Sequence, residues 1–164
     1  EIGRLVGRGP MIGIKLWIAC RANDPRVWPV AEAAIALGVP VLQHCWAKFG
    51  GNLEHESTPW DVADLARRYP ELKLIAAHLS GLQEEGVIAL APHANVFLDT
   101  SGMLADTGML EFALRHVGPE RILFGSDAPG RNIGAALARI RNTSLPPDVE
   151  EAILGANFIR LFFP

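Results

Sequence analysis

Short apolar segments alternate with amphipathic segments along the whole chain. Five runs rich in β-branched residues predict strands, at residues 11–18, 39–44, 72–78, 96–100 and 121–126. Apolar residues at helical spacing predict helices at residues 25–37, 59–69, 82–90, 107–117, 132–141 and 148–162. This alternation is typical of strand–helix–strand units, and it predicts an α/β fold with a parallel sheet.

Local sequence signals support these boundaries. Thr58 and Pro59 are a helix N-cap followed by proline at the first helical position, while Gly38 and Gly118 are typical of helix ends. A polar residue also stands near the carboxyl end of every predicted strand. These residues are Lys15, His44, His78, Asp99 and Asp127, separated by 29, 34, 21 and 28 residues, and each interval fits one βα unit.

Five parallel strands fit either an open doubly wound sheet or part of a barrel. Barrel enzymes carry catalytic residues at the carboxyl ends of several strands, so the polar strand ends favour the barrel. In a barrel these five side chains share one rim. His93 precedes a strand and His116 ends a helix, so both are expected at the opposite rim.

His44, His78 and Asp127 could form a metal site, because three different strands bring them to one edge. Imidazole and carboxylate groups suit a divalent ion such as Zn²⁺, and a catalytic site leaves one position open for water. Such a water ionises near neutral pH and becomes a nucleophile. The plainer alternative is that each strand-end histidine only satisfies a local hydrogen bond.

Composition narrows the possible functions. The chain has 164 residues, of which 49% are hydrophobic and 20% charged, with a net charge of −3, as expected of one globular domain over residues 1–164. Scattered basic residues argue against a nucleic-acid partner, and no apolar run reaches the roughly 20 residues of a membrane helix. Cys20 and Cys45 are expected to stay reduced, which favours a cytoplasmic location.

Four sequence motifs resemble the amidohydrolase-related family typified by aminocarboxymuconate-semialdehyde decarboxylase. They are Ala-His-Leu-Ser-Gly at 77–81, Val-Phe-Leu-Asp-Thr-Ser-Gly at 96–102, Ile-Leu-Phe-Gly-Ser-Asp-Ala-Pro at 122–129 and the Gly-Ala-Asn-containing helix at 153–162. The resemblance covers nearly the whole chain in the right order. It implies a (β/α)8 TIM-type barrel in which this chain supplies about strands 4 to 8 and the C-terminal helices.

The resemblance also implies roles for the strand-end residues. His44 would be a metal ligand, His78 would polarise water or substrate near the metal, and Asp127 would be both ligand and acid/base, around one ion that is most simply Zn²⁺. The family's His-x-His pair on the first strand, which supplies two ligands, is absent from this sequence.

About three barrel units, roughly 100 residues, are therefore expected to lie elsewhere. The first predicted strand would then leave an unpaired edge. We expect a homo-oligomer or association with the missing N-terminal barrel half. The C-terminal helix is expected to pack against the outside of the barrel.

Several further residues are candidates for substrate binding. Lys15 could pair with a carboxylate across the barrel mouth or bind a substrate carboxylate, and these roles are favoured over metal bridging. The loop at 45–58 could be a substrate lid in which Trp46, Lys48 and His55 set specificity, or a plain surface loop. Arg131 could bind an anion at a helix start. Asp99 is expected to orient a neighbour.

The sequence thus predicts a metal-dependent hydrolase acting on C–N, C–O or lactone bonds of a small molecule. A metal-dependent decarboxylase of a small unsaturated or aromatic acid is the alternative, because the same ligands serve both reactions. A non-catalytic scaffold or subunit is the alternative from another class, motivated by the incomplete ligand set.

Overall fold

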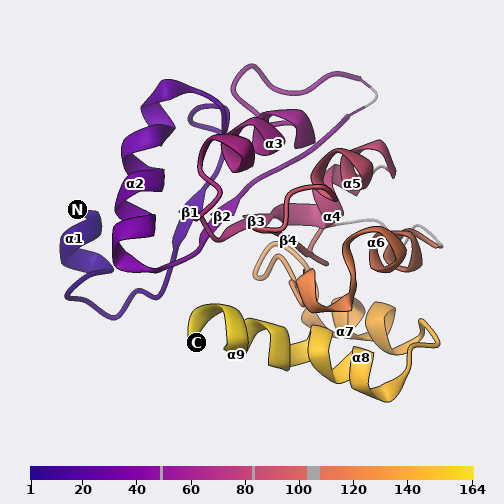
Figure 1. The fold of residues 1–164 in the computed structure, drawn as a ribbon. Helices are drawn as coiled ribbons and strands as arrows, with labels where there is room; N and C mark the ends of the chain where they lie inside the picture. Colours follow the sequence, from indigo (N-terminus) through magenta and orange to yellow (C-terminus); the bar gives the residue numbers. More distant parts are fainter. Residues whose placement is uncertain (49, 83, 103–107) are drawn as a thin grey trace.

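The sheet contains five parallel strands in sequential order, as predicted (Figure 1). The computed structural model describes residues 1–48, 50–82, 84–102 and 108–164. An open doubly wound sheet reverses its strand order at a switch point, whereas sequential order is that of a barrel segment. The strands are β1 Ile14–Leu16, β2 Val41–Gln43, β3 Leu74–Ala76, β4 Val96–Asp99 and β5 Ile122–Leu123.

Helices follow each strand, as the alternation predicts. Before the second strand come α1 Ile2–Leu5, η1 Pro25–Val27 and α2 Trp28–Leu37, and the middle of the chain contains α3 Pro59–Arg68, α4 Ala77–Leu82 and α5 Glu84–Leu90. The remaining helices are α6 Met109–Val117, η2 Pro119–Arg121, α7 Ile133–Arg141, α8 Pro147–Glu151, the π-helical turn η3 Ala152–Ala156 and α9 Asn157–Phe162. Gln83 and Thr107, which fall in two predicted helices, lie outside the described residues.

The predicted helix ends have the expected capping contacts. At the start of α3, the Thr58 hydroxyl accepts a hydrogen bond from the Asp61 amide, and the Asp61 carboxylate accepts one from the Thr58 amide at 2.8 Å. Such caps stabilise a helix by about 1 kcal/mol. At the end of α2, Gly38 adopts a left-handed φ of 68°. Glycine tolerates this conformation without strain.

The two faces of the sheet are covered by different elements. Val41, Leu74 and Leu98 belong to the large core that the sheet shares with α2, α3, α5 and α6. Lys15, Leu42, Ile75 and Phe97 stand in register on the alternate positions and therefore point to the opposite face.

The end of the chain does not follow the predicted packing. Ile153 joins the core on the helix side, but Leu161 and Phe162 of α9 pack against Ile75 and Leu123 on the other face. The prediction that the C-terminal helix packs outside the barrel is therefore wrong for α9. The physical reason is that the second face carries apolar side chains, which α9 removes from water.

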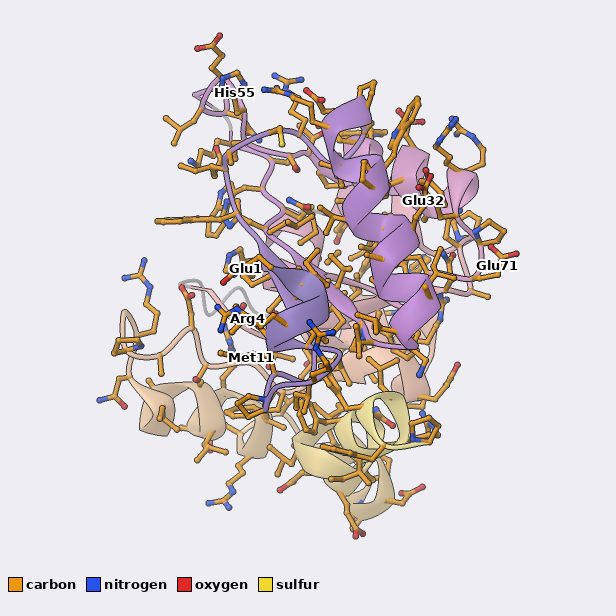
Figure 2. The ribbon with its side chains drawn as sticks, turned by 90° about the vertical axis from the view of Figure 1, so that its left-hand side faces the viewer. Glu1, Arg4, Met11, Glu32, His55 and Glu71 are labelled. Atoms are coloured by element: carbon orange, nitrogen blue, oxygen red, sulfur yellow. The ribbon has the colours of Figure 1, made fainter. Side chains whose placement is uncertain are left out.

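Both edge strands have a single neighbour among the described residues. Trp17 beside β1 is 65% exposed, and Met11, labelled in Figure 2, is exposed as well. Pairing of this edge with upstream sequence or with a second copy stays a prediction, as does the single domain. Within the described part of the chain, no helix is both long enough and apolar enough to cross a membrane.

Candidate functional site

The backbone is strained at two of the predicted strand-end residues. His78 has a φ of 63° and Asp127 a φ of 59°, and Leu79 next to His78 is left-handed as well. Left-handed backbone is unfavourable for residues other than glycine, and where it occurs it gathers at functional sites. Here it lies just after β3 and β5, where the chain turns out of the sheet.

His44 and His78 face each other directly. His44 Nδ1 and His78 Nε2 are 3.2 Å apart, and the two rings meet edge to face. The Trp46 ring lies against His78, with 4.8 Å between ring centroids, and roughly parallel to His44. Two nitrogen ligands of one tetrahedral Zn²⁺ would be about 3.3 to 3.4 Å apart, because Zn–N bonds are about 2.0 to 2.1 Å long. The spacing of this pair therefore fits a shared divalent cation.

A hydrogen-bonded network supports His78 from behind. Its Nδ1 is 2.9 Å from the Ser101 hydroxyl, which donates to Asp99. The same Asp99 oxygen accepts from the backbone amides of His78 and Ser101, at 3.0 and 2.9 Å. An ionised carboxylate only accepts, so the Ser101 proton points to Asp99 and the Ser101 oxygen accepts from His78 Nδ1. Asp99 thus orients a neighbour, as the sequence predicts.

Glu56 supports His44 in a similar way. Its carboxylate lies 2.9 Å from His44 Nε2 and also pairs with the Lys48 ammonium at 2.7 Å. Sequence reasoning missed Glu56 and Ser101, because neither stands at a strand end. The one available signal for Ser101 is its place two residues after Asp99, within the 96–102 motif.

A cavity of about 380 Å³ lies on the α9 face of the sheet and collects four of the five predicted rim residues. Its polar lining includes Lys15, His78, Asp99 and Asp127. The apolar walls come from both the strands and α9, namely Leu42, Ile75, Leu123, Phe124, Phe158 and Phe162. Burial lowers the pKa of Lys15, an effect partly opposed by the charges of Asp99 and Asp127. Burial likewise lowers the pKa of His78.

Asp127 stands apart from the histidine pair. Its side chain is 46% exposed, and its carboxylate lies 3.9 Å from the guanidinium of Arg131. The described residues contain no group of three histidine, cysteine or acidic side chains that surrounds one point. His44 and His78 thus supply two donors, and the assignment of Asp127 as a third ligand stays a prediction.

The other candidates lie in several places. Trp46 contacts the histidine pair, and Lys48 contacts Glu56, the partner of His44. His55, in contrast, is exposed at the outer end of the same loop (Figure 2). Arg131 lines a neighbouring hollow of about 160 Å³.

The two histidines expected at the opposite rim lie away from these candidates. His116 stacks on Phe112 in α6. His93 precedes β4, so both His93 and His116 lie away from the cavity, at the strands' amino-terminal side as predicted.

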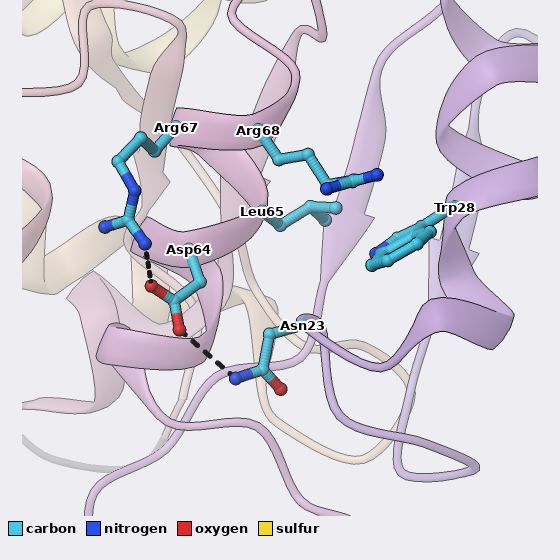
Figure 3. Close-up of a pocket in the computed structure, with 6 residues that line it drawn as sticks. All are labelled: Asn23, Trp28, Asp64, Leu65, Arg67 and Arg68. Atoms are coloured by element: carbon cyan, nitrogen blue, oxygen red, sulfur yellow. Dashed lines mark hydrogen bonds and ion pairs between the residues drawn. The ribbon is translucent and has the colours of Figure 1, made fainter.

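A second hollow of about 380 Å³ lies between α2 and α3 (Figure 3). Its charged side chains already have partners, because Arg67 pairs with Asp64 at 2.6 Å and Arg68 lies 3.6 Å from the centre of the Trp28 ring. No strand-end residue lines it. We assign it no function.

Among the solved structures that are similar to this one are three decarboxylases. A 5-carboxyvanillate decarboxylase from Sphingomonas paucimobilis is 19% identical with a TM-score of 0.72, and the match covers 93% of this chain and 58% of that one. A dihydroxybenzoic acid decarboxylase from Polaromonas sp. JS666, with bound manganese and the inhibitor 2-nitroresorcinol, is 23% identical with a TM-score of 0.68, covering 87% and 55%. A 2,6-dihydroxybenzoate decarboxylase in complex with 2,6-dihydroxybenzoate is 19% identical with a TM-score of 0.79, covering 99% and 65%.

These likenesses confirm the fold as part of a (β/α)8 barrel, and this chain spans 55% to 65% of the length of those three. No sequence among curated proteins matches this chain. The sequence profile of the amidohydrolase family, however, matches residues 1–163. The chain therefore belongs to the amidohydrolase family.

Proposed function

We propose that this chain is the C-terminal part of a divalent-metal-dependent decarboxylase that acts on a small carboxylated aromatic ring. The observation that carries the proposal is the cavity on the α9 face, where Lys15, His78 and Asp127 meet apolar walls. Its volume of about 380 Å³ falls in the range of small-molecule pockets, roughly 300 to 1,000 Å³.

The lining suits an aromatic acid. Leu42, Ile75 and Phe162 offer apolar surface to the faces of a ring. Lys15 is the cationic side chain in this lining, and its ammonium can pair with the ring carboxylate. Burial strengthens such a pair, because a low local dielectric increases the attraction between opposite charges.

Decarboxylation replaces a ring carboxylate by hydrogen. A proton is added to the ring carbon, the bond to the carboxylate carbon breaks, its electron pair returns to the ring and carbon dioxide leaves. We assign the proton transfer to Asp127, which lines the cavity. His44 and His78 would hold a divalent cation, which when bound stabilises negative charge on substrate oxygens.

Decarboxylation takes first place over hydrolysis because the three structures described above are decarboxylases, although a putative 2-pyrone-4,6-dicarboxylic acid hydrolase, 20% identical, is similar as well. The sequence alone put hydrolysis first. Manganese in one of them makes Mn²⁺ as strong a candidate as Zn²⁺, and two imidazole ligands suit either ion.

The test uses the full gene product, stripped of metal and then supplied with Mn²⁺ or Zn²⁺. It is incubated separately with two groups of substrates: aromatic acids, namely dihydroxybenzoates and carboxyvanillate, and hydrolase substrates, namely lactones and esters. Chromatography follows loss of the acid and gain of the phenol. We expect metal-dependent decarboxylation of at least one aromatic acid. Turnover of the lactones or esters alone would return hydrolysis to first place, and no turnover of either group would favour the scaffold.

A further inference from the structure

Glu56 is a buried carboxylate that contacts His44, although it stands in a loop and not at the end of a strand. It comes from the loop between β2 and α3 and is only 2% exposed. Its two oxygens accept from the Lys48 ammonium at 2.8 and 2.7 Å and from the Leu53 amide at 3.0 Å, and one of them lies 2.9 Å from His44 Nε2.

Both oxygens of Glu56 accept hydrogen bonds from the Lys48 ammonium, at 2.8 and 2.7 Å. This salt bridge identifies the group as an ionised carboxylate. An ionised carboxylate accepts hydrogen bonds and donates none. His44 must therefore carry its proton on Nε2, which leaves the lone pair on Nδ1.

The lone pair of His44 Nδ1 points at His78 Nε2, 3.2 Å away. Ser101 and Asp99 impose the matching arrangement on His78, whose Nδ1 donates to the Ser101 oxygen. The free lone pair of a neutral His78 is then on Nε2. Two lone pairs at this distance repel each other unless a proton or a metal cation lies between them.

We propose that Glu56 is a positioning residue that fixes the tautomer and orientation of His44 so that Nδ1 is presented to a divalent cation. This rests on the metal site of the proposed function. A carboxylate behind a ligating histidine is a general way to raise ligand basicity and set its direction. Lys48 pairs with the same carboxylate, so Glu56 joins the loop at 45–58 to His44 through two separate contacts.

The plainer role for Glu56 is to close the loop through Lys48, with His44 as a bystander. The two roles differ in what removing the carboxylate does to His44. A loop-closing role leaves the His44 tautomer and the metal affinity unchanged, whereas a positioning role alters both. Lys48→Met separates them further, because it removes the loop contact and keeps the His44 contact.

The experiment measures histidine side-chain tautomers by ¹⁵N–¹H NMR in metal-free protein and the affinity for Mn²⁺ and Zn²⁺ by calorimetry. The variants are Glu56→Ala, Glu56→Gln and Lys48→Met, with Glu54→Gln as the matched control, since Glu54 is an exposed residue of the same loop. In the wild type and Glu54→Gln we expect His44 protonated on Nε2. In Glu56→Ala we expect a mixture of tautomers and metal affinity lowered roughly 10- to 100-fold.

Glu56→Gln keeps an acceptor oxygen, so its affinity should fall between wild type and Glu56→Ala, and it gives the answer if Glu56→Ala does not fold. Lys48→Met should keep the wild-type tautomer, because the Glu56 carboxylate still has its contacts with His44 Nε2 and the Leu53 amide. An unchanged tautomer and an affinity within twofold of wild type in both Glu56 variants would overturn the proposal. Wild-type protein with the expected tautomer and tight metal binding, but no decarboxylation, would overturn only the proposed function.

Discussion

Replacing Asn157 by alanine should destabilise the fold more than any exposed substitution in the same region. Asn157 is 1% exposed at the start of α9. Its side-chain amide donates to the carbonyl oxygens of Pro119 and Ile122, both at 2.7 Å, and its own oxygen accepts from Arg160 at 3.0 Å. These bonds tie the last helix to the start of β5.

The magnitude follows from the groups left without partners. Alanine removes both donors, but the Pro119 carbonyl keeps the backbone amide of Ile122 as a donor. The buried Ile122 carbonyl loses the Asn157 donor, so the free energy of unfolding should fall by roughly 1 to 3 kcal/mol. Whole domains are stable by only about 5 to 15 kcal/mol. With a urea m-value of about 2 kcal/mol/M, the unfolding midpoint should drop by roughly 0.5 to 1.5 M.

Urea titration followed by circular dichroism measures this shift in the 164-residue chain. The matched control is Asn142→Ala, because Asn142 is exposed at the end of α7 in ordinary helical conformation. The control should stay within about 0.5 kcal/mol of wild type. If Asn157→Ala unfolded at the same urea concentration as the control, the reasoning from unsatisfied carbonyls would be refuted.

Three further outcomes are expected. Because burial lowers the pKa of His78 in the folded chain, the unfolded chain binds a proton on this imidazole more readily, so the free energy of unfolding should fall as the pH drops below 6.5. Urea titrations at pH 5.5 and 7.5 measure this fall, which should be smaller in His78→Gln than in the wild type. An equal fall in the two proteins would argue against this role of His78. Gly125→Ala should cost roughly 1 to 3 kcal/mol in the same assay, because its Cβ would lie 3.0 Å from Ser101 Cβ and 3.1 Å from Asp99 Cγ. Asp127→Asn should keep the fold, since asparagine tolerates a left-handed backbone, and should lower decarboxylation about 10²- to 10⁴-fold; full turnover would remove Asp127 from the mechanism.

The sequence was sufficient for those features that depend on local patterns. Thr58, Pro59 and Gly38 marked helix ends correctly because caps and left-handed turns have specific residue requirements. The strand-end positions of Lys15 and His78 followed from strand spacing, and both line the cavity.

Contacts that depend on the path of a loop were not predictable in this way. Glu56 stands twelve positions after His44 in the sequence, in the loop between β2 and α3, and no periodicity fixes where such a loop turns. The packing of Leu161 was missed for a related reason. An amphipathic pattern indicates that a helix has an apolar side, but it does not indicate which face of the sheet that side covers.

The sequential order of the strands has a consequence for how the chain is made. Each strand pairs with the one synthesised just before it, so the sheet can grow unit by unit as the chain leaves the ribosome. The face bearing Leu42 and Ile75 is different, because it is covered by α9, which comes after all five strands in the chain. Until residues 157–162 are released, α9 cannot cover that apolar surface, so aggregation can compete with folding while the residues between the strands and α9 are synthesised.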